Sequence, residues 1–268
     1  MKKKIFIITI HLIISNITTI AIAGQSDDLA AWTPIQIGIS SDMQIANMNS
    51  DLYGLGLGFY CKNKNTAGIN LNVLGSGTNE NFYGIQLSGL SNRNKGKSYG
   101  LQIAGLENVN ADISYGAQVG FYNESKKNIG LQFGIGNSGD FIGIQAAFLS
   151  NCSLDLIHFD NFRVDMAPDR KIIGAQLAFV SNNAATCYGI QISGTNINDY
   201  LIGGQIGFGN ESGTATGFQI GAMNFVKDIK GVQIGLINVA DNCYGVQIGI
   251  INIMKEAKRY YPIINAKF

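Results

Sequence analysis

The stretch from Asp155 to Arg170 holds the densest group of side chains that could do chemistry, with four acids, two arginines and one histidine. Such a group could bind a ligand, fold into a lumen, or support an enzyme through His158 and Arg163, because loops carry function disproportionately. The alternative is a worn copy of a structural repeat whose opposite charges neutralise one another. We favour this alternative, and we keep His158 and Arg163 as candidate residues of a loop site.

No other pattern in the chain indicates a reaction. Gly-rich segments cradle phosphate groups where a strand leads through a loop into a helix, whereas the glycines here alternate inside strand-like segments. The one histidine outside residues 1–23 and the scattered cysteines do not make a usual zinc site. No grouping of Ser, His and Asp stands out. We therefore expect a protein that is not an enzyme, with no catalytic residue, no metal ligand and no cofactor.

Glutamine recurs at one slot of a repeated segment. These side chains could line an uncharged polar lumen, or they could bond one another and hold neighbouring strands in register. Regular repetition favours the register role. The column consists of Gln86, Gln102, Gln118, Gln132, Gln145, Gln176, Gln191, Gln205, Gln219, Gln233 and Gln247.

The repeated segment reads Gly-x-Gln-φ-Gly-φ-x-Asn, where φ is apolar, and a repeat this short means one structural unit copied many times. The cleanest copies are 217–224, 231–238 and 245–252, the last two ending in Asn238 and Asn252. Its strict copies begin at Gly84, Gly100, Gly116, Gly130, Gly143, Gly174, Gly189, Gly203, Gly217, Gly231 and Gly245.

Looser copies extend the array in both directions. Two begin at Gly54 and Gly68, two carry Pro34 or Pro262 in the Gly slot, and one decayed copy is expected near Ile157–Asn161, within the irregular stretch 150–171. With the eleven strict copies these make sixteen units. They cover nearly all of residues 24–268, so we predict a single β-repeat domain.

Each unit is predicted to be one β-strand, because apolar residues alternate with Gly and Gln at a period of two. In the unit at 231–238, Val232, Ile234 and Leu236 share one face. Acids and bases avoid the strand centres and collect in the connections. The Asn that ends each unit suits a turn.

The first residues form an export signal. Three lysines precede an apolar stretch from Ile5 to Ile22, and Ala21-Ile22-Ala23 resembles a cleavage site. We predict a signal peptide at 1–23 and a mature chain from Gly24; the alternative is an uncleaved anchor, which the polar residues after Ala23 disfavour. No later apolar stretch reaches the roughly 18 residues of a transmembrane helix.

Charge and cysteine content exclude further classes. Removing the three lysines of the leader changes the formal net charge from +1 to −2, which predicts no nucleic-acid partner and no broad basic patch for anionic lipid. The cysteines are Cys61, Cys152, Cys187 and Cys243. The last two occupy the same slot four repeats apart, roughly 19 Å at ordinary strand spacing. A disulfide needs Cα atoms within about 7 Å, so we expect buried, unpaired thiols.

Two architectures fit the repeat, and our main prediction is an antiparallel outer-membrane β-barrel of about sixteen short strands. An even strand number, the final Phe and aromatic residues at both strand ends of the apolar face favour the barrel. The aromatic rows are Tyr53, Tyr83, Tyr99, Tyr115, Tyr188 and Tyr244 at one end, and Phe59, Phe121, Phe148, Phe179 and Phe208 at the other.

The alternative architecture is a parallel β-solenoid, in which identical residues stack from unit to unit. The constant polarity of the motif favours it, as do the prolines at both ends and the short apolar band. The variable spacing of 13 to 16 residues between glycines and the lack of apolar residues for a second wall count against it.

The tandem Gly-Val-Gln-Ile-Gly-Leu-Ile-Asn units, the Tyr-Gly and Lys-Gly junctions and the closing segment 262–268 resemble the leptospiral-type surface-repeat family of exported bacterial proteins. The similarity spans Gly54 to Phe268. It implies a surface or outer-membrane location and carries no established activity.

The last residues also resemble the final strand of outer-membrane barrels, whose terminal Phe is read during insertion. This resemblance implies that Phe268 is a membrane-insertion signal and that outer-membrane lipid and the barrel-assembly machinery are partners. The function we expect is a non-enzymatic outer-membrane protein with a narrow or plugged lumen; the alternative is a surface-exposed solenoid for adhesion or scaffolding.

Overall fold

A computed structural model describes residues 32–151 and 170–268. These residues divide into two compact units on either side of the junction between Tyr115 and Gly116, and each unit is described by itself. The strands of the described residues are β1 (Trp32–Gly38), β2 (Asp51–Asn63), β3 (Thr66–Thr78), β4 (Phe82–Ser88), β5 (Ser91–Asn94), β6 (Ser98–Ala104), β7 (Glu107–Val119), β8 (Tyr122–Asn151), β9 (Lys171–Ala178), β10 (Ser181–Met254) and β11 (Arg259–Lys267).

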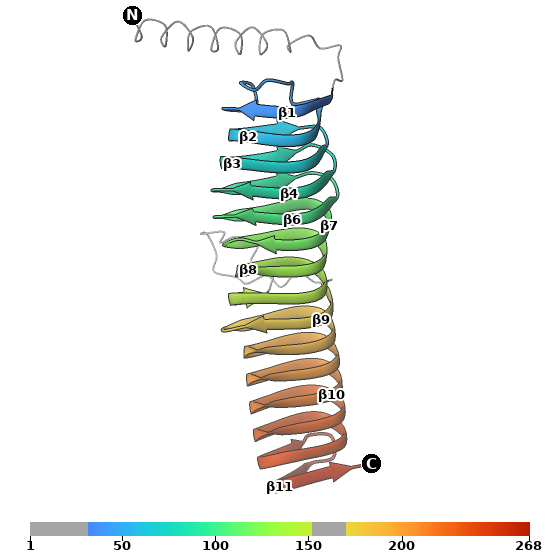
Figure 1. Ribbon diagram of the computed structural model, residues 1–268. Coiled ribbons are helices and arrows are strands. Elements are labelled where there is room, and N and C mark those ends of the chain that lie inside the picture. Colours follow the sequence, from blue (N-terminus) through green and yellow to red (C-terminus); the bar gives the residue numbers. More distant parts are fainter. Residues whose placement is uncertain (1–31, 152–169) are drawn as a thin grey trace, which may run out of the picture. The chain divides into compact units, whose positions relative to one another are not determined.

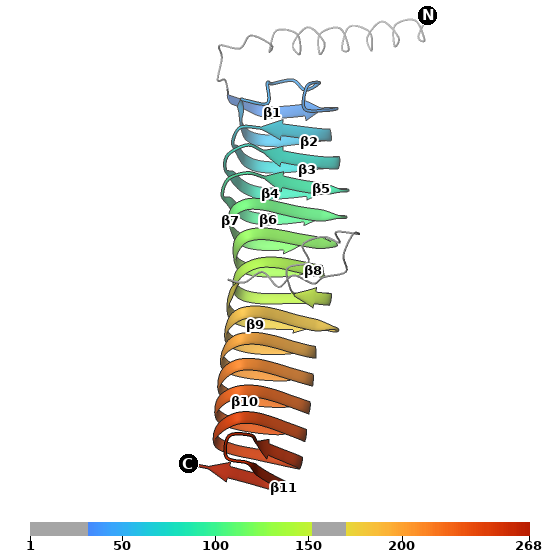
Figure 2. The same cartoon turned by 180° about the vertical axis from the view of Figure 1, so that it is seen from behind.

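In the first unit, each copy of the motif forms one rung with two strands. The motif itself lies in a first wall, where β3, β4 and β6 pair in parallel with Gly opposite Gly and Gln86 opposite Gln102. A shorter strand such as β5 then forms a second wall, where it pairs in parallel with β3 and β7. Figure 1 shows the rungs, and Figure 2 shows them from behind, with β5 labelled. This arrangement is a parallel β-solenoid.

The second unit repeats this plan from Gly116 onward. Strands β8 and β10 are long because strand geometry continues around the corners between the walls. β9 pairs in parallel with β8 on one side and β10 on the other, again with Gly opposite Gly and Gln opposite Gln. The parallel order of β8, β9 and β10 forms the first wall of this unit.

The predicted antiparallel barrel is therefore wrong, and the alternative parallel solenoid is confirmed. Each copy of the repeat completes a full turn and returns to the same wall, so that successive motif strands run in the same direction. The second wall does not need apolar residues because it contributes Asn and Ser to the interior, as Asn92 and Asn94 of β5 do. Each copy of the repeat also supplies two strands rather than the single strand that we predicted.

The prediction of a decayed unit between Gly143 and Gly174 is also wrong. These two glycines lie directly opposite each other in β8 and β9, as do Gln145 and Gln176. No rung fits between two paired strands. The extra residues are thus an insertion between neighbouring rungs, and residues 152–169 lie outside the described part.

Both ends of the array have strands that depart from the motif. β1 pairs in parallel with β2 and carries Pro34 opposite the strand of Gly54. β11 pairs antiparallel to β10, and Asn265 donates to Gln247 at 3.0 Å. The end strands of a solenoid have no further rung to pair with, and Pro and irregular backbone disfavour the addition of another strand. The prediction that the Pro-containing repeats at both ends form edges is confirmed, although β11 is antiparallel.

Glycine at the first slot of the motif is required by the stacking distance. Gly217, Gly231 and their equivalents have φ between +127° and +149° in the strict copies. A Cβ on Gly217 would overlap the backbone carbonyl of Gly203 in the preceding rung. Any side chain at this slot would therefore strain the backbone and push two rungs apart.

We predict that Gly217→Ala destabilises the chain by at least about 2 kcal/mol, because both the positive φ and the overlap with a carbonyl oppose the methyl group. The matched control is Gly209→Ala in the rung before that of Gly217, where a Cβ would meet only Thr195 Cγ2 at 3.7 Å. Urea unfolding monitored by circular dichroism measures both. Equal stability of the two variants would contradict the proposed stacking constraint.

Candidate functional site

The interior between the walls is built from side-chain amides. Gln219, Gln233 and Gln247 are fully buried, and each donates from Nε2 to the Oε1 of the Gln one rung before it at 2.8 Å. In the first unit, Gln102 donates to Gln86 at 2.9 Å. This Gln ladder links neighbouring rungs, so the register role that regular repetition favoured is the one that the geometry provides.

A second column, the Asn ladder, runs beside it. Asn224 Nδ2 donates to Asn238 Oδ1 at 2.7 Å and to the Ile234 carbonyl at 3.0 Å, and Asn224 accepts from Asn210 at 2.8 Å. All of these Asn side chains are buried. We predicted that this Asn caps a turn at the end of the repeat. Its side-chain amide instead faces the interior and bonds the neighbouring rungs.

The second glycine of the motif makes room for the Asn ladder. A Cβ on Gly235 would lie 2.6 Å from Asn224 Nδ2 and 3.1 Å from Asn238 Oδ1. Where Ser88 or Ala104 takes this slot, the chain inserts one more residue before the buried Asn. The spacing of Gly and Asn in the motif thus follows from one corner of the rung.

The predicted repeat residues all stand at equivalent positions in their rungs. Their Gly residues stack along the first wall, their Gln residues form the ladder, and Asn238 and Asn252 belong to the Asn ladder. These residues are Gly84, Gln86, Gly100 and Gln102 in the first unit, and Gly116, Gln118, Gly217, Gln219, Gly231, Gln233, Asn238, Gly245, Gln247 and Asn252 in the second.

The Gln ladder is interrupted near the start of the first unit. Gly56 occupies the Gln slot there, and the side chain of Asn70 leans toward it. The buried amides of Asn63, Asn70 and Asn72 have no hydrogen-bond partner in the structure. Buried amides are normally paired, and each unpaired group costs about 1–3 kcal/mol. These rungs are therefore less well bonded than those with a full ladder.

Apolar interior residues lie at the corner that leads into the first wall. In the second unit, Phe141, Ile172, Leu201 and Ile229 are buried there, and Cys187 and Cys243 share their column. The described cysteines, Cys61 included, are free thiols, as predicted from the repeat spacing. Burial raises the pKa of Cys187 to about 12 and those of Cys61 and Cys243 to about 11, so these thiols stay protonated at neutral pH.

The apolar rows of the motif face outward instead of forming the interior. Ile234, Leu236, Ile248 and Ile250 are 40–66% exposed. The aromatic rows that we assigned to a barrel girdle lie on the same outer face, and Tyr83, Tyr99 and Tyr115 stack there at 4.8 Å. A period-2 pattern separates two faces, and here the amide face is the buried one.

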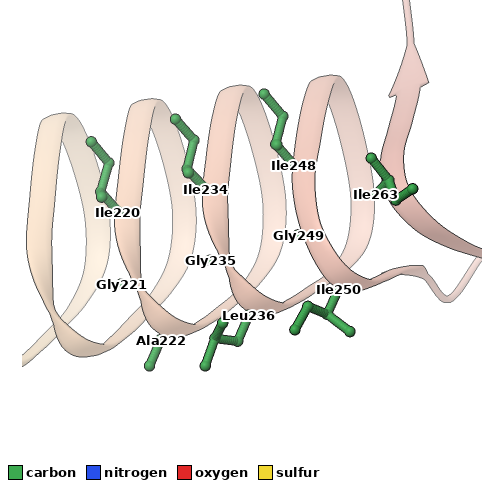
Figure 3. Close-up of a pocket in the computed structure, with 10 residues that line it drawn as sticks. All are labelled: Ile220, Gly221, Ala222, Ile234, Gly235, Leu236, Ile248, Gly249, Ile250 and Ile263. Carbon is green, nitrogen blue, oxygen red and sulfur yellow. The ribbon is translucent and has the colours of Figure 1, made fainter.

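An apolar groove, here called the aliphatic groove, runs across the last rungs of the second unit. Ile220, Ile234 and Ile248 form one side, and Ala222, Leu236 and Ile250 form the other. Gly221, Gly235 and Gly249 form the floor between the two rows, as Figure 3 shows. The groove has a volume of about 640 Å³ and closes at Ile263 of β11. The groove was not predicted from the sequence, although the small residue between two aliphatic ones recurs in every clean copy.

The first unit has a groove of the same kind. Leu71, Leu87 and Ile103 form one side, with Val73 and Gly89 beside them, and its volume is about 490 Å³. The feature therefore follows from the motif and appears separately in each unit.

Among the described residues, no group of three or more His, Cys, Asp or Glu could hold a metal ion, and no helix is long and apolar enough to cross a membrane. His158 and Arg163 lie outside the described residues. Phe268 is almost fully exposed at the end of the chain, next to β11.

Comparison with family models, with curated proteins and with solved structures gives no match for this chain. The resemblance to surface-repeat proteins stays an expectation from the motif.

We predict that Asn224→Ala costs about 3 kcal/mol of unfolding free energy, because it removes three buried hydrogen bonds: the one accepted from Asn210 and those donated to Asn238 and to the Ile234 carbonyl. The control is Asn242→Ala, whose exposed amide makes one bond to Asp228 and should change stability by less than about 0.5 kcal/mol. Thermal and urea unfolding provide the comparison. A similar cost for both variants would contradict a structural role of the Asn ladder.

Thiol titration gives a second prediction. The folded pKa of Cys187 lies above the ordinary value of 9.0, so the folded state keeps a proton that the unfolded state loses. This contribution to stability is complete below pH 9 and decreases as the pH rises toward 12. Cys187→Ala, which copies Ala215 of the same column, should reduce the loss of stability in that range. In a Cys152→Ser chain, Ellman's reagent at pH 8 should label Cys61, Cys187 and Cys243 only after unfolding; rapid labelling of this chain in its native state would disprove their burial.

Proposed function

We propose that this chain is an exported, non-enzymatic surface protein whose solenoid serves as a scaffold or adhesion module. The observation that carries the proposal is the outer face of the first wall, where every motif copy presents aliphatic or aromatic side chains. Exposed apolar surface on this scale marks an interaction face. The predicted leader at 1–23 supports export, and the surface-repeat resemblance supports a location at the outer membrane or cell surface.

The amide side chains support a structural rather than a catalytic role for the repeat. Gln219 and Asn224 spend their donors and acceptors on neighbouring rungs. A regular interior of this kind holds the outer rows at a constant spacing, which suits a repeated binding face. The barrel-assembly machinery is not proposed as a partner, because that expectation depended on the barrel.

We predict that proteinase K added to intact cells removes the protein, and that it fractionates with the outer membrane or the medium. An Ala21→Arg/Ala23→Arg variant should stay in the cytoplasm, because it destroys the predicted cleavage site and charges the leader. A periplasmic marker that resists the protease is the control for intact cells. Recovery of the unaltered chain in the cytoplasm would sink the proposal.

A further inference from the structure

We infer that the first wall of the second unit lies on a lipid surface, with hydrocarbon chains of the lipid seated in the aliphatic groove. The inference rests on the proposed surface location and names the partner of that face. It begins with the chemistry of the groove: its sides are Ile, Leu and Ala, and its floor is Gly. No side chain that lines it carries a hydrogen-bonding group or a charge.

The backbone of the wall is paired with neighbouring strands along the groove, except at Ile250 and Ile251, where the pairing of β10 with β11 is interrupted. The strands that form it are interior rungs of β10, with β11 paired beyond the last of them. A peptide strand could not extend the sheet at this place, because each rung already has neighbours. The occupant must therefore bind through apolar contact alone.

The direction of the groove fits a linear hydrocarbon. Its two rows run from rung to rung, perpendicular to the strands (Figure 3). Three spacings of about 4.8 Å separate the four rungs, so the groove is roughly 14 Å long. An extended acyl chain can lie along such a groove, and each buried methylene contributes about 0.8 kcal/mol of transfer free energy.

The margin of the first wall carries Lys and Tyr side chains. The Nζ of Lys171 lies 5.0 Å from the centre of the Tyr188 ring, and the Nζ of Lys267 lies 4.8 Å from the centre of the Tyr244 ring. Lys230 stands in the same row as these tyrosines, whereas Lys171 shares its slot in the rung with Asp140 and Asp228. Tyr and Lys at the edge of an apolar band match the headgroup level of a membrane.

The charged residues on the other side of the rung leave this face open to lipid. Lys227, Asp228 and Asp241 lie on the second wall or its turn, and Asp241 pairs with Lys255 at 3.0 Å. Charged groups prefer water, so the second wall would face away from the bilayer. The rung is thus amphipathic across its thickness.

The test is flotation of the purified protein, expressed as the full chain, with phosphatidylcholine vesicles. Binding to this neutral lipid is expected, because apolar contact dominates. Leu236→Asp/Ile250→Asp should lower the vesicle partition coefficient at least about tenfold. Both side chains are more than half exposed, so folding should survive, as circular dichroism can check. The control Thr214→Asp/Lys227→Gln changes the net charge equally on the second wall and should bind like the unaltered chain.

A fluorescent probe tests the seat of the acyl chain. Trp32 is the only tryptophan, so Trp32→Phe gives a dark background for Leu236→Trp or Thr214→Trp. Phosphatidylcholine brominated on its acyl chains should quench the tryptophan at 236 and leave that at 214 unquenched. Equal quenching at both positions would overturn the inference.

Other outcomes also overturn it. Binding only when phosphatidylglycerol is added would indicate electrostatic adsorption, and a dimer in light scattering that Leu236→Asp/Ile250→Asp dissociates would assign the wall to a second copy. A surface-exposed protein that ignores vesicles would contradict the inference and leave the proposed function intact. A cytoplasmic protein that binds vesicles would contradict the proposed function and leave the lipid-binding face supported.

Discussion

The structure depends on amide side chains that bond their equivalents one rung away. Each Gln or Asn of a ladder can donate to one neighbour and accept from another, as Asn224 does between Asn210 and Asn238. Such bonds contribute about 1 kcal/mol each, but an unpaired buried amide costs more. A rung is therefore stable only beside another rung with the same residue at the same slot. This requirement explains why the motif recurs so faithfully and why β1 and β11 close the ends with different sequences.

The backbone follows from the same stacking. Gly at the first slot allows a positive φ and leaves space for the carbonyl of the preceding rung, whereas Gly at the fifth slot leaves space for the Asn amides. With polar groups filling the interior, the aliphatic and aromatic residues are left on the outside. The aliphatic groove is a direct result, because its floor is the glycine that the Asn ladder requires. The proposed interaction face is thus a consequence of how the interior is bonded.

Much of the rung could be predicted from the sequence. The slots of Gly, Gln and Asn, the strand periodicity, the edge positions of Pro34 and Pro262 and the unpaired state of Cys187 and Cys243 follow from short-range spacing. The corner that lengthens by one residue where Ser88 or Ala104 replaces Gly could also have been found. The insertion after Asn151 could not, since a gap of two repeat lengths fits a lost rung equally well until Gln145 and Gln176 are seen to bond.

The sequence by itself determined that one unit is copied, that its residues alternate between two faces and that equivalent residues stack. It did not determine which face is buried. An alternating strand satisfies either a barrel with its apolar side outward or a solenoid with two walls, and the motif contains no residue that distinguishes them locally. The tertiary structure decided this, because only the return of the chain to the same wall brings each amide against its equivalent. Once the amides are paired inside, Tyr, Ile and Phe remain outside.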